Sequence, residues 1–160
     1  KNKNELKNFL ENINIFKMKV SKHKKFIVEE YIEGKELTVS TINFSKKIEA
    51  LGVTEIKHDK SFFDYKSKYS KGLAKHILPA KISKKNYKKC LSLAIKAHNL
   101  LGCKSIARTD FILNTKNNKI YFLETNSQPG LTSLSLLPEQ AKYKKISFSE
   151  LILSIIENSI

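Results

Sequence analysis

Two short stretches of the chain place charged and amide side chains two positions apart, between apolar residues. Arg108 and Asp110 form the first pair, and Glu124 and Asn126 form the second. Side chains alternate between the two faces of a β-strand, so each pair points to one face if its stretch is a strand. Hard oxygen ligands without histidine or cysteine suit Mg²⁺. The spacing therefore predicts a magnesium site built from Asp110, Glu124 and Asn126.

The residues between the two pairs decide whether the pairs meet. Residues 114–118 are rich in Asn and Lys and predict a hairpin loop, in which Leu113 faces Lys119 and the numbers of paired residues sum to an even number. In that register the four polar side chains share one face, and a slip of two residues leaves this unchanged. The opposite face then carries four apolar side chains, Phe111, Leu113, Tyr121 and Leu123. Two ionised carboxylates held close together repel each other, which costs free energy unless a cation lies between them. The alternative is an ion pair of Arg108 with Glu124 across the strands, without a metal.

Arg108 is the single arginine among 30 basic side chains. This sequence uses lysine wherever a point charge is enough, so the arginine indicates a need for a planar fork that binds carboxylate or phosphate at two points. The alternative is an ordinary surface ion pair.

A turn rich in small and hydroxyl residues follows Asn126 directly, over residues 127–136. Gly130 lets the backbone approach a ligand closely, and the N–H groups and hydroxyls after it suit a carboxylate or phosphate. Pro-Gly also occurs in plain turns. Its position beside the Glu-x-Asn pair favours a binding site for an anion.

Helices and strands that position these residues follow from the hydrophobic period. Helical spacing predicts a leading amphipathic helix, a helix that Ser83 caps and that ends at Gly102, and a last helix opened by a capping box at 147–150. In the second helix, His98 is predicted to be a core or boundary residue rather than a ligand. The predicted strands are 26–32, 36–44, 47–56, 105–113 and 120–125. The first three predict an antiparallel meander, with a tight connection at residues 33–35.

Residues 58–81 follow no period, and a connector of this length predicts a lid or binding loop. The whole pattern predicts one compact α+β unit.

Composition narrows the class of protein. The chain has 160 residues, a net charge of +15 and 41% hydrophobic residues, which is typical of one folded domain. No apolar run approaches the roughly 18 residues of a membrane helix. Cys90 and Cys103 have no CxxC partner, which argues against a disulfide framework or a zinc site and favours a reducing cytoplasm. Lysines spread along the chain, without arginines and aromatics on a basic face, argue against a nucleic-acid partner.

Five segments together resemble the carboxyl-terminal part of D-alanine:D-alanine ligase, an ATP-grasp enzyme. In chain order they are EEYIEGKELTV (29–39), FFDYKSKY (62–69), ILPA (77–80), LGCKSIARTDFIL (101–113) and FLETNSQPGLTSLSLLP (122–138). The resemblance implies that ATP phosphorylates the carboxylate of one D-alanine and that the amine of a second attacks the acyl phosphate. The product is the dipeptide used for peptidoglycan in the cell wall.

The same resemblance implies roles for individual residues. The adenine would lie along Glu29, Glu30, Tyr31 and Ile32, with Glu36 on the ribose hydroxyls. Asp110, Glu124 and Asn126 would bind two Mg²⁺ ions, with Mn²⁺ as the alternative metal. Arg108 and the N–H of Gly130 would stabilise the transition state. Ser135 and Leu136 would take the carboxylate of the second D-alanine, and Lys68 and Tyr69 would belong to the closing lid.

In domain terms, the resemblance implies a lead-in helix over 1–25, adenine-side strands over 26–57, a lid loop over 58–81 and a metal- and substrate-binding part over 82–160. We also expect a homodimer for the full-length parent. Three departures from the family pattern are Thr109 in place of an aliphatic residue, Leu134 in place of a histidine, and Ser127-Gln128 after Asn126.

The family's amino-terminal substrate domain and glycine-rich loop have no counterpart in these residues. The first residue is lysine, and the opening segment lacks the apolar core of a signal peptide, so we expect a piece of a longer protein that is not a competent ligase alone. The alternatives are another ATP-grasp carboxylate-amine ligase and a non-catalytic ATP-grasp relic.

Overall fold

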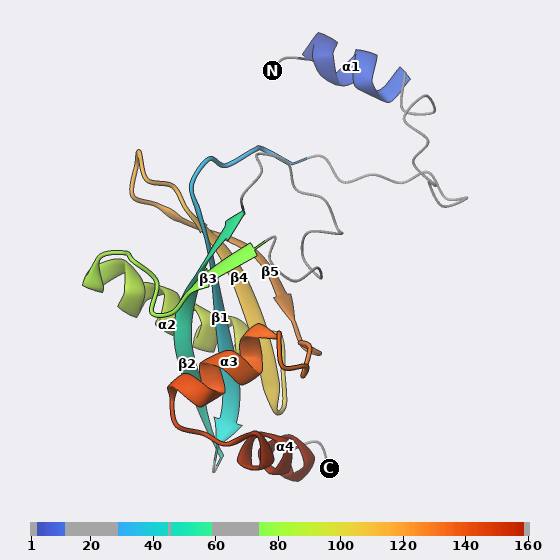
Figure 1. The fold of residues 1–160 in the computed structure, drawn as a ribbon. Helices are drawn as coiled ribbons and strands as arrows, with labels where there is room; N and C mark the ends of the chain where they lie inside the picture. Colours follow the sequence, from blue (N-terminus) through green and yellow to red (C-terminus); the bar gives the residue numbers. More distant parts are fainter. Residues whose placement is uncertain (1–2, 12–28, 45, 59–73, 159–160) are drawn as a thin grey trace. The chain divides into compact units, whose positions relative to one another are not determined.

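The computed structural model describes residues 3–11, 29–44, 46–58 and 74–158. The chain divides into two compact units, Lys1–Tyr31 and Ile32–Ile160. Helix α1 (Lys3–Glu11) belongs to the first unit, and the other helices and the strands of the described residues belong to the second (Figure 1). No helix in the described part of the chain is long and apolar enough to cross a membrane.

The second unit is built on one antiparallel sheet of five strands. These are β1 (Lys35–Phe44), β2 (Lys47–His58), β3 (Ala74–Ile77), β4 (Ile106–Leu113) and β5 (Ile120–Asn126). Their order across the sheet is β3-β2-β1-β4-β5, so β1 is the central strand and β4 lies beside it (Figure 1). This sheet with its flanking helices confirms the predicted α+β class and four of the predicted strands.

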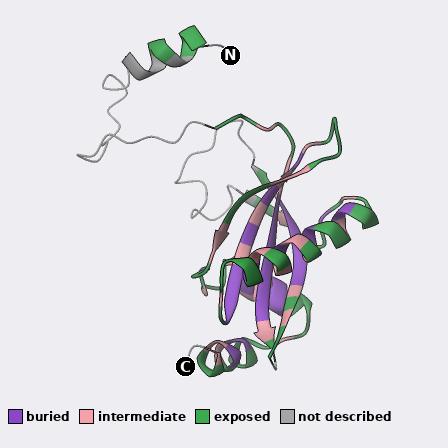
Figure 2. Cartoon of the chain, turned by 180° about the vertical axis from the view of Figure 1, so that it is seen from behind, coloured by how far each residue is buried: buried purple, intermediate pink, exposed green. Residues whose placement is uncertain are grey.

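Helices cover the two faces of the sheet separately. Helix α2 (Lys84–Leu100) packs on one face, where Leu37, Val39 and Phe111 form a core with Cys90 and Ala94. Helices α3 (Leu136–Tyr143) and α4 (Phe148–Glu157) cover the other face through a second core around Ile42. Figure 2 shows the buried residues concentrated in the central strands. Because β1 is covered on both sides, side chains along its middle are fully buried.

The predicted helix caps are confirmed. The Ser83 side chain accepts a hydrogen bond from Asn86 N at the start of α2. Ser147 and Glu150 form both arms of the capping box that opens α4. Satisfying these otherwise unpaired N–H groups fixes where each helix begins. His98 is buried in α2 as predicted, with its Nδ1 2.8 Å from Thr41 Oγ1.

Three parts of the fold differ from the predictions. Residues 29–32 lie in no helix or strand, and 26–28 lie outside the described residues, so the predicted strand over 26–32 is wrong where the structure describes it. A β-branched composition does not form a strand without a partner for its backbone hydrogen bonds. Strand β3 falls inside the region predicted as an aperiodic loop, because four residues paired with the edge of β2 are too short to show a period. Helix α3 was not predicted either.

Candidate functional site

The polar residues of β4 and β5 face each other across the two strands. Arg108 pairs with Asn126, and Asp110 pairs with Glu124. Paired residues of an antiparallel ladder point to the same face. The predicted shared face of these four side chains is therefore confirmed, while their roles stay predictions.

The predicted register is wrong, although its parity holds at these two pairs: with Leu113 opposite Lys119, Arg108 would face Glu124, whereas it pairs with Asn126. The ladder shifts between Asp110 and Phe111, so that Leu113 pairs with Ile120 rather than with Lys119. Beyond the shift Phe111 pairs with Phe122, and the two rings meet edge to face with centroids 6.2 Å apart. Tyr121, predicted on the face of Phe111, pairs with Ile112 instead. One extra residue in β5 reverses the parity of every pair beyond it.

Arg108 binds Asp110 through two nitrogens on one edge of its guanidinium. Nε lies 3.0 Å from Asp110 Oδ1, and Nη2 lies 2.9 Å from Oδ2. Glu124 is more distant, with Oε1 4.0 Å from Arg108 Nη2, and its side chain is largely exposed. The alternative pair of Arg108 with Glu124 is thus secondary to a bidentate contact along β4. This is the two-point geometry for which arginine, and not lysine, is suited.

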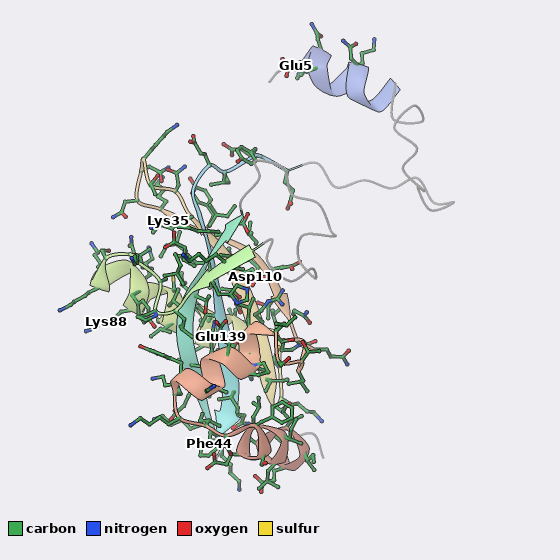
Figure 3. The ribbon with its side chains drawn as sticks, in the orientation of Figure 1. Glu5, Lys35, Phe44, Lys88, Asp110 and Glu139 are labelled. Atoms are coloured by element: carbon green, nitrogen blue, oxygen red, sulfur yellow. The ribbon has the colours of Figure 1, made fainter. Side chains whose placement is uncertain are left out.

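A second residue, Thr38, holds the same carboxylate. Thr38 lies opposite Asp110 in the pairing of β1 with β4, and its hydroxyl donates a hydrogen bond of 2.6 Å to Asp110 Oδ1. Thr38 is fully buried, whereas the Asp110 side chain, labelled in Figure 3, is about one fifth exposed. Asp110 is therefore held in one orientation by groups from two strands.

The turn after β5 folds back on itself. Asn126 Oδ1 accepts a hydrogen bond of 2.8 Å from Gln128 N. Ser135 Oγ accepts one of 3.1 Å from Thr132 N, and a Cβ at Gly130 would lie 2.7 Å from this oxygen. Gly130 is thus needed for a close approach inside the turn.

Ser135 is also the N-cap of α3, where its side chain makes no capping hydrogen bond. Since its hydroxyl serves the turn, the backbone N–H groups that open α3 at Leu136 have no side-chain cap there.

The donor set on the polar face suits a hard divalent cation. Asp110 and Glu124 offer carboxylate oxygens from paired positions, and Asn126 offers an amide oxygen two residues further along β5, on the same face. The described residues contain no group of three or more His, Cys, Asp or Glu side chains that could hold a metal ion. Any such site would therefore rest on two carboxylates and an amide, and Arg108 is the cation that faces Asp110 in this structure.

The residues predicted to bind the nucleotide or to form the lid divide into three groups. Glu36, half-buried near the start of β1, is two positions before Thr38 and points to the same face as Thr38 and Asp110. Glu29, Glu30 and Tyr31 are exposed and belong to the first unit, and Ile32 begins the second unit outside any strand. Lys68 and Tyr69 lie outside the described residues.

Two residues of this region were not singled out from the sequence, Thr38 and Gln140. Gln140 of α3 is fully buried, and its side-chain amide bonds Ser40 N, Thr38 O and Thr54 Oγ1 at 2.8, 3.2 and 2.9 Å. A polar residue on the buried side of a helix was the available signal for Gln140. For Thr38 the signal was its spacing of two from Glu36, but its partner is given only by the pairing of β1 with β4.

Comparisons with known proteins agree with one another. Residues 1–157 match the family described as "D-ala D-ala ligase C-terminus". A D-alanine–D-alanine ligase of Wolbachia pipientis wMel is 49% identical over 137 residues, which are 85% of this chain and 42% of that protein. The corresponding ligase of Pelagibacter ubique is 39% identical over 153 residues, 95% of this chain and 47% of that protein. The chain thus spans less than half the length of these relatives.

Solved structures give the same result. A D-alanine–D-alanine ligase from Bacillus anthracis, in complex with ATP, superposes with a TM-score of 0.69 at 28% identity and covers 99% of this chain and 48% of its own. The VanG D-Ala:D-Ser ligase from Enterococcus faecalis has a TM-score of 0.69 at 30% identity, over 82% of this chain and 38% of its own. A match along nearly the whole chain, in sequence and in fold, means that the chain belongs to the D-alanine–D-alanine ligase family, as its carboxyl-terminal part.

Proposed function

We propose that the protein containing this chain joins two D-alanine molecules at the expense of ATP, through an acyl phosphate, to supply a peptidoglycan precursor. The observation that carries the proposal is the polar face, where Arg108, Asp110, Glu124 and Asn126 lie in paired positions within a chain of this family. Since ATP and D-alanine are metabolites of the cell interior, the proposed location is the cytoplasm.

Asp110, Glu124 and Asn126 are the proposed ligands of two Mg²⁺ ions, or of Mn²⁺. When bound, the ions would neutralise negative charge on the phosphates during phosphoryl transfer. The fit is supported by the hard-oxygen donor set on one face of the ladder.

Arg108 is proposed to bind the phosphate and the developing oxyanion with its planar fork, together with the backbone N–H of Gly130. The chain supports this role by placing the guanidinium beside Asp110, among the proposed metal ligands. Holding these donors in place before reaction is what lowers the cost of the charged transition state.

Ser135 and Leu136 are proposed to bind the carboxylate of the second D-alanine. Leu136 opens α3, and helix amino-termini favour anions through their unpaired N–H groups. Leu134, exposed two residues before Leu136, stands where the family pattern has histidine, and we propose that it shapes this pocket.

Glu29, Glu30, Tyr31, Ile32 and Glu36 are proposed to hold the adenosine. Lys68 and Tyr69 are proposed as parts of a lid that excludes water from the acyl phosphate.

The test is phosphate release from ATP by the natural full-length protein with Mg²⁺ and one candidate second substrate at a time. D-alanine, D-serine, D-lactate and L-alanine are compared, and products are identified by mass spectrometry. D-alanyl-D-alanine with D-alanine, and no product with L-alanine, supports the proposal. Turnover only with D-serine or D-lactate would favour another ligase of this class, and silence with all four by a folded protein would favour a relic. Dipeptide formation by the 160-residue chain alone would contradict the proposal that it needs the rest of the protein.

A further inference from the structure

Asp110 is held by one charged donor, Arg108, and by one neutral donor, the buried hydroxyl of Thr38. We propose that Thr38 is a positioning residue, which fixes the Asp110 carboxylate for a divalent cation by holding Oδ1. This inference rests on the proposed function, because it assigns Thr38 a part in the proposed metal site.

The two donors differ in how they respond to a cation. A metal ion approaching Asp110 repels the guanidinium of Arg108, whose side chain is about one fifth exposed. The Thr38 hydroxyl is neutral, fully buried and part of the central strand. The bond from Thr38 therefore persists when Arg108 is displaced, and it is the contact that orients Asp110 in both states.

Helix α3 holds Thr38 in turn. Gln140 Nε2 donates a hydrogen bond of 3.2 Å to the Thr38 carbonyl, and Gln140 Oε1 accepts one of 2.8 Å from Ser40 N. Ser40 lies where the register of β1 and β2 shifts, so the side-chain amide satisfies an N–H at an irregular point of the ladder. Because α3 begins at Leu136, the same contacts tie the proposed substrate end of α3 to the strand that orients Asp110.

Partners of this kind are known to matter for metal sites. Hydrogen bonds to a ligating carboxylate orient it, and removing one typically costs 10–100-fold in metal affinity or activity. Thr38→Val keeps the shape of the side chain and removes only the hydroxyl, whereas Thr38→Ser keeps the hydroxyl and removes a methyl group. The pair separates the hydrogen bond from the packing.

Thr109→Val is the matched control. Thr109 precedes Asp110 in β4 and is as fully buried as Thr38. Its Oγ1 lies 3.0 Å from Thr125 Oγ1, on the face of the sheet opposite to Asp110. Thr109→Val therefore removes a buried threonine hydroxyl, as Thr38→Val does, but leaves the hydrogen bonds of Asp110 unchanged.

The experiment titrates the natural full-length protein and its variants with Mn²⁺, following free Mn²⁺ by electron paramagnetic resonance, with circular dichroism to verify folding. We expect Thr38→Val to weaken Mn²⁺ binding by about 10–100-fold, while Thr38→Ser and Thr109→Val keep the parent affinity. Mg²⁺ activation of phosphate release should shift to higher concentration in Thr38→Val by the same factor.

Three results would overturn the inference, and they differ in whether the proposed metal site is overturned with it. Unchanged Mn²⁺ affinity in Thr38→Val, in a parent that binds Mn²⁺ and loses it on Asp110→Asn, overturns the role of Thr38 and leaves the proposed function standing. A folded parent that binds no Mn²⁺ overturns the proposed metal site and the role of Thr38 together. An equal loss in Thr38→Val and Thr38→Ser would assign the effect to packing and also overturn the inference.

Discussion

Replacing Gln140 by leucine removes a buried amide that joins α3 to the sheet. Leucine has a similar volume, so the main cost comes from the groups left behind, which are Ser40 N–H, the Thr38 carbonyl and the Thr54 hydroxyl. A buried polar group without a partner costs about 1–3 kcal/mol. Three such groups, partly offset by burying an apolar side chain, lower the free energy of unfolding by about 3 kcal/mol. At about 2–4 °C per kcal/mol for a domain of this size, the melting temperature falls by about 6–12 °C.

The assay is urea and thermal unfolding of the purified protein, followed by circular dichroism. Lys142→Leu, on the exposed side of the same helix, is the control for adding leucine to α3. A Gln140→Leu variant as stable as this control would refute the reasoning, because it would mean that the three contacts contribute no net stability.

Three further predictions concern charge and reactivity. Arg108→Lys should lower kcat by about 10²–10³ in the phosphate-release assay, since a single ammonium cannot reproduce the planar fork proposed to bind the phosphate and the oxyanion; an unchanged rate would return Arg108 to a surface ion pair. Burial lowers the pKa of His98, so the fold favours the neutral ring. The stability that this shift contributes should be complete above the unfolded pKa of about 6.5 and should decline as the pH falls below it. The test compares the urea midpoints of the parent and of His98→Gln between pH 7 and pH 5, and the same pH dependence in both proteins would contradict this prediction. Burial raises the pKa of the Cys90 thiol to about 11, so a thiol reagent at pH 8 should label Cys103 in the native protein and Cys90 only after unfolding, as read by peptide mass spectrometry.

Much of the candidate site was predictable because local rules decide it. Alternation along a strand places Arg108 with Asp110, and Glu124 with Asn126, whatever the rest of the fold does. Helix starts at Ser83 and Ser147 were predictable for the same reason, since a cap acts within one turn of its helix. The prediction that these four side chains share one face is correct because the register shift lies beyond Asp110 and does not separate the two pairs.

Other features depend on contacts that are distant in the chain. The register shift after Asp110 has no local signal in residues 114–118, so Leu113 was assigned the wrong partner. Residues 29–32 have strand-like composition but no strand to pair with among the described residues. The hydrogen bond from Thr38 to Asp110 spans 72 positions of sequence and becomes visible only when β1 is known to lie beside β4.

The central claim is that the polar face of β4 and β5 is the reactive site of an ATP-dependent ligase. Its most direct test is D-alanine-dependent phosphate release by Glu124→Gln in the full-length protein, with Glu157→Gln in the exposed last turn of α4 as the matched control. The account predicts that Glu124→Gln loses turnover at least about 10²-fold with an unchanged circular dichroism spectrum, and that Glu157→Gln retains it. Parent-like turnover by Glu124→Gln would contradict the account and remove this carboxylate from the site.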